Sequence, residues 1–166
     1  PIVITDQYLR FARFPRNNAR IMLLSGGRLD SSDSGIRKYT PNSSLRHSAV
    51  YGDVIEYSYL FQTDGNGFRV TYECNARDAA DNLVAITGDS FTEGVGIKYQ
   101  DTYVGLIEKK LKNKSNDIEV LNAGVQSYST SIYLSKIYHL LERKNLPITD
   151  IVVMVSGGDF FDDYFK

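Results

Sequence analysis

The sequence predicts an α/β protein in which a β-rich N-terminal part precedes a half built on parallel strands. Two observations support this prediction. The second half contains three short apolar runs, each followed by a turn of small and polar residues: 83–86, 118–121 and 151–155. The turns begin 34 residues apart, at Gly88, Asn122 and Ser156, which is the interval expected of successive β-α-β units. Right-handed crossovers make such strands parallel, so we expect the three turns to lie at one edge of the sheet.

The composition is that of an ordinary globular protein with one core. The chain has 166 residues, with a hydrophobic content of 42% and a charged content of 23%, which exclude disordered and collagen-like classes. We divide it into a β-rich appendage, residues 1–80, and an α/β core, residues 81–166, which a polar hinge at Asp78–Asp81 joins. Its apolar runs are far shorter than the ~20 residues that cross a bilayer, so no membrane span is predicted. Because the chain starts at Pro1 without a signal-peptide pattern, we expect a processed or trimmed form.

Charge and motif content give little support to other functional classes. Eight Lys or Arg against three Asp give residues 1–47 a charge of +5, which leaves −6 for the remainder of a chain whose net charge is −1. Arginines at positions 10, 13, 16 and 20 lie among aromatic residues, but no nucleic-acid-binding motif accompanies them, so no nucleic-acid partner is predicted.

No cofactor or metal is predicted either. The single cysteine, Cys74, has no partner for a disulfide or a CxxC site and is expected to be a small buried hydrophobe. A P-loop is absent, Gly94–Gly96 is only part of a GxG motif, and no His, Cys or carboxylate group has metal-ligand spacing.

The N-terminal part predicts a β-hairpin. The first 48 residues show no sustained period, and the Ser, Gly and Asp cluster at 25–35 indicates a long loop. Over 50–62, aromatic and apolar side chains alternate with polar ones, as a half-buried strand requires. A turn at 63–67 and a second alternating run at 68–72 complete the hairpin.

Helical periodicity follows the first two turns of the second half. The first predicted apolar stripe consists of Tyr103, Leu106, Ile107 and Leu111. A second helix begins with Ser129 or Thr130 as its cap. Its predicted apolar stripe consists of Leu134, Ile137, Tyr138 and Leu141.

The most informative stretch is the apolar strand at 82–87 with the turn Gly88-Asp89-Ser90 that follows it. In an open α/β sheet, ligands bind at the carboxyl ends of the strands, which places Ser90 where chemistry usually occurs. Two interpretations remain open from these residues alone. Either Ser90 is a nucleophile, or Gly88 makes the turn and Asp89 or Ser90 only caps the next helix. We expect Asp89 to support the turn rather than to act as an acid or base.

These residues resemble the blocks of the SGNH hydrolases, also called the GDSL family of esterases and lipases. Gly88-Asp89-Ser90-Phe91 is similar to the first block, in which the Ser is the nucleophile and its N–H contributes to the oxyanion hole. Gly124 in Asn122-Ala123-Gly124 resembles the second block, whose Gly donates a backbone N–H to that hole. Gly157-Gly158-Asp159 resembles the third block. The resemblance covers about residues 83–163 and implies a flavodoxin-like parallel-sheet core.

The sequence departs from the family pattern at two points. Gly158 occupies the position of the third-block Asn, whose side-chain amide completes the oxyanion hole, and loss of one such donor costs on the order of 10² to 10³ in kcat. The family's Asp-x-x-His, which supplies the base and its orienting acid, is absent from the 166 residues. We therefore expect the given chain to be an incomplete domain and to be inactive or nearly so by itself.

Other ionisable residues are weaker candidates for the site. His139 lies opposite the predicted apolar stripe of its helix, which favours an exposed position. His47 lies in a loop-rich segment, and nothing around it places it at the sheet edge. Asp159 matches the family pattern, although its cluster with Asp162 and Asp163 is equally typical of a solvated loop with a capping Asp.

The resemblance predicts a serine ester hydrolase, either an esterase or lipase or an O-acyl esterase or acyltransferase, that works through an acyl-Ser90 intermediate on a small-molecule or glycan ester. It assigns Ser90, Gly124 and the Gly158 position to the oxyanion hole, with Asp89 and Asp159 as supporting residues. The alternative is a degenerate SGNH domain that binds carbohydrate or protein.

The residues themselves assign neither a cellular location nor an oligomeric state. Asn66-Gly67-Phe68-Arg69 is similar to a segment that precedes the core in some bacterial envelope members of the family. That resemblance implies an envelope or periplasmic location.

Overall fold

The computed structural model describes residues 20–24, 30–31, 36–51, 54–71, 82–115, 117–143 and 146–159. Several sequence-based predictions fall outside these ranges: the arginines at 10, 13 and 16, Cys74, the hinge at Asp78–Asp81, the boundary between residues 80 and 81, Asp162 and Asp163.

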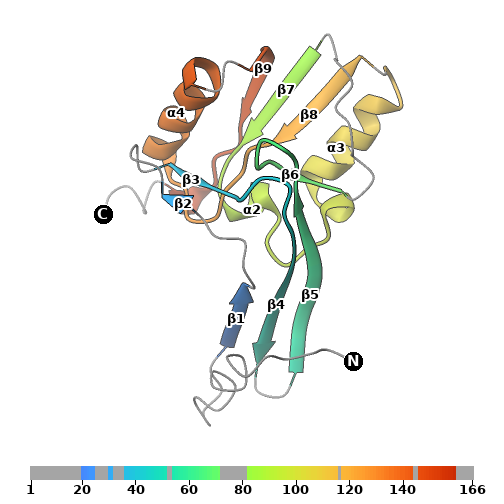
Figure 1. Cartoon of the computed structure of the whole chain (residues 1–166), viewed down its shortest axis with the longest axis vertical. Helices are drawn as coiled ribbons and strands as arrows, with labels where there is room; N and C mark the ends of the chain where they lie inside the picture. Colours follow the sequence, from blue (N-terminus) through green and yellow to red (C-terminus); the bar gives the residue numbers. More distant parts are fainter. Residues whose placement is uncertain are drawn as a thin grey trace.

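The described chain is a mixed α/β structure (Figure 1). Its strands are β1 (Arg20–Leu24), β2 (Asp30–Ser31), β3 (Arg37–Lys38), β4 (Ser44–Tyr51), β5 (Val54–Thr63), β6 (Arg69–Val70), β7 (Asn82–Thr87), β8 (Ile118–Asn122) and β9 (Ile148–Val153). Its helical segments are α2 (Ser90–Glu93), the 3₁₀ helix η1 (Tyr99–Asp101), α3 (Tyr103–Lys112), α4 (Thr130–Tyr138) and the π-helical turn η2 (His139–Arg143). None of the described helices is long and apolar enough to cross a membrane.

Seven of the described strands form one sheet, in the order β1-β4-β5-β6-β8-β7-β9, while β2 and β3 form a separate pair. β7 pairs in parallel with β8 on one side and with β9 on the other, so the parallel arrangement predicted from the 34-residue spacing is confirmed. The other pairs of this sheet are antiparallel. The two parts meet where β6 pairs with β8 through Arg69 and Asn122.

Residues of β7 alternate between two apolar layers. Leu83 and Ala85 pack in one cluster with Leu140 of η2. Ile86 faces the opposite way and packs with Val104 of α3. Burial on both faces explains why the β7 segment is apolar throughout. The helices that follow β7 and β8 therefore cover opposite faces of the parallel strands, and α2 lies at the carboxyl ends of those strands (Figure 1).

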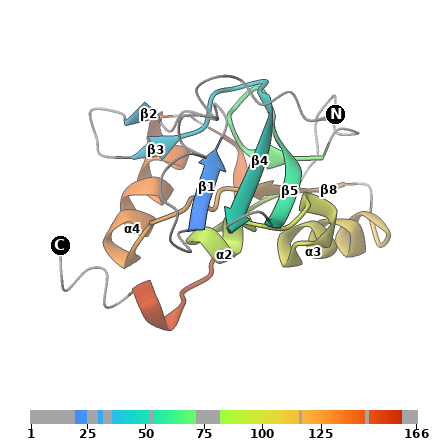
Figure 2. The ribbon, with the colours of Figure 1, turned by 90° about the horizontal axis from the view of Figure 1, so that it is seen from below.

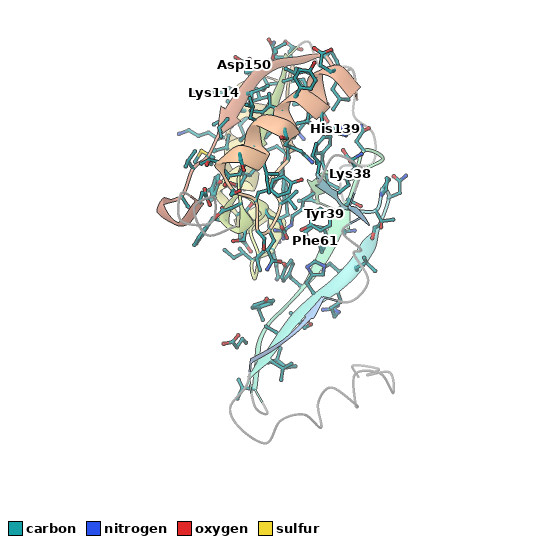
Figure 3. The ribbon with its side chains drawn as sticks, turned by 90° about the vertical axis from the view of Figure 1, so that its left-hand side faces the viewer. Lys38, Tyr39, Phe61, Lys114, His139 and Asp150 are labelled. Carbon is teal, nitrogen blue, oxygen red and sulfur yellow. The ribbon has the colours of Figure 1, made fainter. Side chains whose placement is uncertain are left out.

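β4 and β5 form a long hairpin that extends away from the parallel part (Figures 1 and 3). The sequence predicts no strand within the first 48 residues, and this is wrong for β1, β2, β3 and most of β4; β2 lies inside the loop predicted at 25–35. In β4, His47 and Ala49 are buried while Arg46 is exposed and Ser48 is partly exposed, so the alternation is present. A polar ring and a methyl group on the buried side weaken the signal that apolar periodicity detects.

An aromatic cluster connects the base of this hairpin to the parallel part. Tyr39 and Phe61 have ring centroids 4.6 Å apart and lie close together at the hairpin base (Figure 3). The same cluster contains Tyr128 and Tyr133, which belong to the segment that follows β8. The tyrosines and phenylalanine of β5 therefore form a packed strand face, which is the usual role of such side chains.

The apolar stripe predicted for α4 is largely wrong, and the one predicted for α3 is half right. In α4, Leu134 is 71% exposed and Tyr138 is 65% exposed, whereas Tyr133 and Lys136 are buried. The buried side includes a phenol and the aliphatic stem of a lysine, which a simple apolar count does not recognise. In α3, the predicted Tyr103 and Leu111 pack against the cluster that contains Val104, whereas the predicted Leu106 and Ile107 are exposed. The predicted cap Ser129 is the N-cap of α4.

β9 lies at one edge of the described sheet. It begins at Ile148, three residues before the predicted strand, and its only described partner is β7. Val152 and Val153 are each 40% exposed. Strands of parallel sheets are usually buried on both faces, so this exposure is unusual.

Candidate functional site around the Ser90 turn

Ser90 opens α2, directly after β7. Asp89 is the N-cap of this helix, and its Oδ1 accepts the Phe91 N–H at 2.9 Å. Ser90 is half-buried, and Phe91 beside it is 73% exposed, so solvent reaches the turn. Within the described residues, no hydrogen bond engages the Ser90 hydroxyl or its N–H. Asp89 therefore has the capping role, and none of the described residues takes up either donor of Ser90.

Gly88 allows the ends of β7 and β9 to meet α2. A Cβ on Gly88 would lie 2.0 Å from Oγ1 of Thr92 and 2.8 Å from the carbonyl oxygen of Met154, the residue after β9. The Val125 N–H also donates to the Gly88 carbonyl at 3.1 Å. Any side chain at this position would force the first turn away from the other two.

The turn after β8 is attached to α2 by Asn122. Its Nδ2 donates to the Thr92 carbonyl at 3.0 Å, and its Oδ1 accepts the Gly124 N–H at 3.0 Å. A Cβ on Gly124 would lie 2.5 Å from the Glu93 nitrogen, so the backbone at Gly124 packs directly on α2. Gly124 thus lies beside the Ser90 helix, with its N–H already donating to Asn122.

Ser156 joins the third turn to the first. Its hydroxyl lies 2.9 Å from Asp159 Oδ1 and 3.2 Å from Asp89 Oδ2, so a single proton serves two carboxylates. Asp159 is buried, and its Oδ2 accepts the Tyr133 hydroxyl at 2.6 Å and the Ser156 N–H at 2.7 Å. Burial and the hydrogen bond to Asp159 raise the pKa of Tyr133 above its ordinary value. Asp159 therefore fixes Ser156 against the residue that precedes Ser90.

The two glycines of the third turn lie in open space. Nothing lies within 4 Å of a Cβ built on Gly157, and a Cβ on Gly158 meets only Ser156 Oγ, at 3.8 Å. Neither position requires a glycine for steric reasons. Gly158 supplies no side-chain donor, as its residue type implies, although a Cβ there meets no close contact among the described residues.

Arg69 of β6 holds the carboxyl end of α2. Its Nη1 donates to the carbonyls of Glu93 and Gly94, the latter at 2.8 Å, and its Nη2 donates to Ile97 at 2.5 Å. The side chain is 1% exposed. Its guanidinium carbon lies 5.1 Å from the ring centroids of both Tyr59 and Phe61, which are cation–π distances.

Glu93 places a buried carboxylate between α2 and the second turn. Its Oε2 accepts the Gln126 N–H at 2.6 Å, and the Tyr39 hydroxyl donates to the same carboxylate. Burial raises the pKa of Glu93, while these hydrogen bonds and the nearby charge of Arg69 act in the opposite direction. Burial raises the pKa of Tyr39 strongly, and the charge of Glu93 adds to this effect.

Neither histidine contacts Ser90 within the described residues. The His47 ring stacks on Phe61 at a centroid distance of 4.5 Å, and burial lowers its pKa to about 4. His139 is half-buried and lines a cavity, large enough for about one water molecule, together with Lys38 and Tyr39 (Figure 3). The exposed position predicted for His139 is therefore wrong, because the face of α4 that turns inward is not the predicted one.

The structure brings together residues that sequence reasoning did not single out: Arg69, Asn122, Glu93, Tyr133 and Ser156. Each connects α2 or its N-cap, directly or through Asp159, to a segment distant in sequence. The sequence held some indication of three of these residues. Asn122 and Ser156 stand directly at strand ends, and Arg69 is the last residue of the Asn66–Arg69 segment. Nothing in the sequence indicated that Arg69 and Glu93 are buried, since Arg and Glu side chains are usually exposed.

The strand order places these turns at a topological switch point. The chain leaves β7 for β8 on one side and then returns past β7 to β9 on the other. In open α/β sheets, ligands bind outside the carboxyl ends of strands at such a point. Figure 2 shows α2 in the middle of the molecule, between α3 and α4. A ligand there would meet the Ser90 hydroxyl, the first N–H groups of α2 and the Ser156–Asp159 turn.

This arrangement supplies a hydroxyl and backbone donors, as acyl transfer requires. In the described part of the chain, no group of three His, Cys, Asp or Glu side chains is arranged to hold a metal ion. Comparison with known proteins found no protein-family model, no curated protein and no solved structure that matches this chain.

Proposed function

We propose that this protein is a serine ester hydrolase of the SGNH type in which Ser90 is the nucleophile. The observation that carries the proposal is the convergence of three turns on α2, where Asp89, Gly124 and Ser156 all lie against the helix that Ser90 opens. These are the three turns whose residues resemble the SGNH blocks. The order β8-β7-β9 also agrees with the second, first and third strands of a flavodoxin-like sheet.

The proposed reaction forms and then breaks one acyl–enzyme bond. The Ser90 oxygen attacks the ester carbonyl carbon, its proton passes to a base, and the bond to the alcohol oxygen breaks as that alcohol takes up the proton. Water then attacks acyl-Ser90, which releases the acid and restores the hydroxyl. In an acyltransferase, a second alcohol takes the place of this water.

The oxyanion that forms in each step needs hydrogen-bond donors. The Ser90 N–H is the first proposed donor, because no described partner uses it. Gly124 is the second, and its N–H would have to be shared between Asn122 Oδ1 and the oxyanion. Gly158 offers no side chain as the third donor, so we expect a slow enzyme relative to one with an asparagine there.

The proposal requires a base that accepts the Ser90 hydroxyl proton, and the described histidines do not fill this role. His47 is enclosed by aromatic rings, and His139 lines a cavity beside Lys38 and Tyr39. The resemblance assigns the base to the histidine of an Asp-x-x-His segment, which these 166 residues do not contain. We therefore expect little or no activity from these 166 residues without such a segment.

The test is hydrolysis of p-nitrophenyl acetate and butyrate by the 166-residue chain and by the longest natural form that contains it, each beside its Ser90→Ala variant. We expect turnover by a form that carries an Asp-x-x-His segment, and a loss in its Ser90→Ala variant on the order of 10⁴-fold or more. Labelling of Ser90 by a fluorophosphonate, located by peptide mass spectrometry, identifies the nucleophile directly. Equal turnover by the longer form and its Ser90→Ala variant would refute the proposal.

A groove favours carbohydrate binding as the second candidate function. It has a volume of about 540 Å³ and is lined by residues of β5, β6 and η1, with Arg46 of β4. Its charged lining residues, Arg46 and Lys98, are both cationic, and Ser58, Gln62 and Gln100 supply hydroxyl and amide groups. This chemistry fits an acidic glycan. Titration with an acidic oligosaccharide should then give binding that Ser90→Ala retains and that an Arg46→Gln and Lys98→Gln double variant loses.

A further inference from the structure

Arg69 carries a buried positive charge. Neither packing nor ion pairing alone explains why a charged side chain lies at this place in the fold. Its side chain is 1% exposed, comes from a two-residue strand of the N-terminal part and reaches the loop that follows the Ser90 helix. A buried charge is costly unless hydrogen bonds satisfy it, and this guanidinium donates to three backbone carbonyls. Those carbonyls belong to residues 93–97, within seven residues of Ser90.

We propose that Arg69 is a positioning residue of the Ser90 site, which holds the carboxyl end of α2 so that its first residue keeps one orientation. This inference rests on the proposed function, because it concerns the reaction of Ser90. It adds a role for the N-terminal hairpin that the resemblance does not supply.

Two short chains of hydrogen bonds connect Arg69 to Ser90. Arg69 donates to the Gly94 carbonyl, while the Gly94 and Val95 N–H groups both donate to the Ser90 carbonyl, at 2.9 and 3.0 Å. Arg69 also donates to the Ile97 carbonyl, and the Ile97 N–H donates to Gly94 at 3.2 Å. The loop after α2 is therefore held in two ways. Arg69 binds its carbonyl groups, and the Ser90 carbonyl accepts two of its N–H groups.

The local backbone is built to admit the guanidinium. Gly94 has φ +83°, which favours glycine, and a Cβ there would lie 2.8 Å from Arg69 Nη1 and 2.2 Å from Thr102 Cγ2. A helix of four residues has almost no stability of its own, because forming its first turn is unfavourable. The direction of the Ser90 side chain therefore depends on the groups that hold both ends of α2.

The fork of the guanidinium explains why an arginine fits this role. Two of its nitrogens reach three carbonyls that point in different directions, which one ammonium group cannot do with the same geometry. The rings of Tyr59 and Phe61 lie against its faces and limit its motion. Arg69→Lys keeps the charge and loses the fork, so it tests geometry separately from charge.

The experiment compares Arg69→Lys and Arg69→Ala with the unaltered longest natural form of the protein. With p-nitrophenyl acetate, we expect Arg69→Lys to lower kcat on the order of 10²-fold with KM little changed, because a misplaced nucleophile weakens the chemical step. Millimolar guanidinium should restore part of the kcat of Arg69→Ala. Val104→Ala, a cavity variant in the layer beneath α3, controls for lost stability and should leave kcat nearly unchanged.

A second measurement follows hydrogen exchange of the Gly94, Val95 and Ile97 amides in the same variants. Faster exchange in Arg69→Lys, with no such change in Val104→Ala, supports the inference, and unchanged exchange overturns it. Unchanged kcat in both Arg69 variants also overturns it while leaving the proposed function intact. If the unaltered protein shows no Ser90-dependent turnover, the proposed function fails, and a positioning role in that reaction fails with it even where exchange responds.

Discussion

Arg69 and Asn122 are paired across the junction of β6 and β8, and both side chains donate to carbonyls of α2, at Glu93 and Thr92 respectively. The point where the antiparallel part of the sheet joins the parallel part is therefore also the point that holds the Ser90 helix. Any change that separates β6 from β8 should reach Ser90 through two side chains at once.

Gly124→Ala should destabilise the protein because the new methyl group has no space. Its carbon would lie 2.5 Å from the Glu93 nitrogen and 2.7 Å from Thr92 Cβ. We expect a loss of about 1–3 kcal/mol in the free energy of unfolding, measured by urea denaturation. Gly157→Ala is the matched control, because nothing lies within 4 Å of its Cβ. Equal midpoints for the two variants would show that the turn after β8 does not pack on α2 as described.

Gly158→Asn should raise kcat if Ser90 is the nucleophile of an SGNH-type site. A Cβ at this position meets no close contact among the described residues, and the asparagine amide would restore the donor that the family places there. An oxyanion donor is worth on the order of 10² to 10³ in kcat, which sets the largest gain to expect. The measurement is p-nitrophenyl acetate turnover by the longest natural form. The gain should vanish in the Ser90→Ala background, and a Gly158→Asn variant no faster than the parent would contradict the assignment of this turn.

Tyr133→Phe should cost stability through Asp159. The Tyr133 hydroxyl donates to the buried Asp159 carboxylate at 2.6 Å, and its removal leaves a buried acceptor with fewer partners. The expected loss in unfolding free energy is about 1–3 kcal/mol. Tyr138→Phe makes the same chemical change at a side chain that is 65% exposed, so it should lie within about 0.5 kcal/mol of the parent. Equal melting temperatures for Tyr133→Phe and Tyr138→Phe would contradict this prediction.

His47 should make the protein less stable as the pH falls from 6.5 toward 4. In the unfolded chain the imidazole binds a proton near pH 6.5, whereas burial beside Arg69 lowers its pKa in the folded protein to about 4. Between these values the unfolded state binds more protons, so the free energy of unfolding falls by up to ~1.4 kcal/mol per pH unit as acid is added. Well above pH 6.5 the ring is neutral in both states and contributes no slope.

His47→Gln isolates this effect, because it removes the titrating ring while the carboxylates that also titrate in this range stay in place. The charged and titratable groups that face the ring are Tyr59, whose hydroxyl lies 3.4 Å from Nδ1, and Arg69. Urea denaturation at intervals between pH 4 and 7 should therefore show a shallower slope in the variant. If the unfolding free energy of the parent and of His47→Gln changes with pH at the same slope, His47 becomes protonated without the protein unfolding.

Much of the parallel part could be predicted from the sequence because its signals are local. β7 occupies the predicted residues, and the predicted strand at 118–121 corresponds to β8. A short apolar run that ends in small residues is enough to locate such strands. The Ser90 turn was located the same way, since Gly88 and Asp89 have the residue types that such a turn needs.

The rest depended on contacts that sequence patterns do not encode. β4 carries a histidine on its buried side, and α4 buries Lys136, so apolar periodicity missed the strand and chose the wrong face of the helix. The connections to α2 were equally hidden, because Arg69 lies 24 residues from the Glu93 carbonyl that it holds. A buried Arg and a buried Glu become visible only once the partners that satisfy them are placed.

The exposed edge of β9 has a consequence for how this chain behaves in solution. β9 ends in an apolar run, and its outer edge has no described partner, so it is a template on which another strand can add through backbone hydrogen bonds that need no matching sequence. Preparations of the 166-residue chain should therefore scatter more light as their concentration rises. A single charge on that strand, Val153→Lys, should keep them clear, as charged edge residues do in natural sheets.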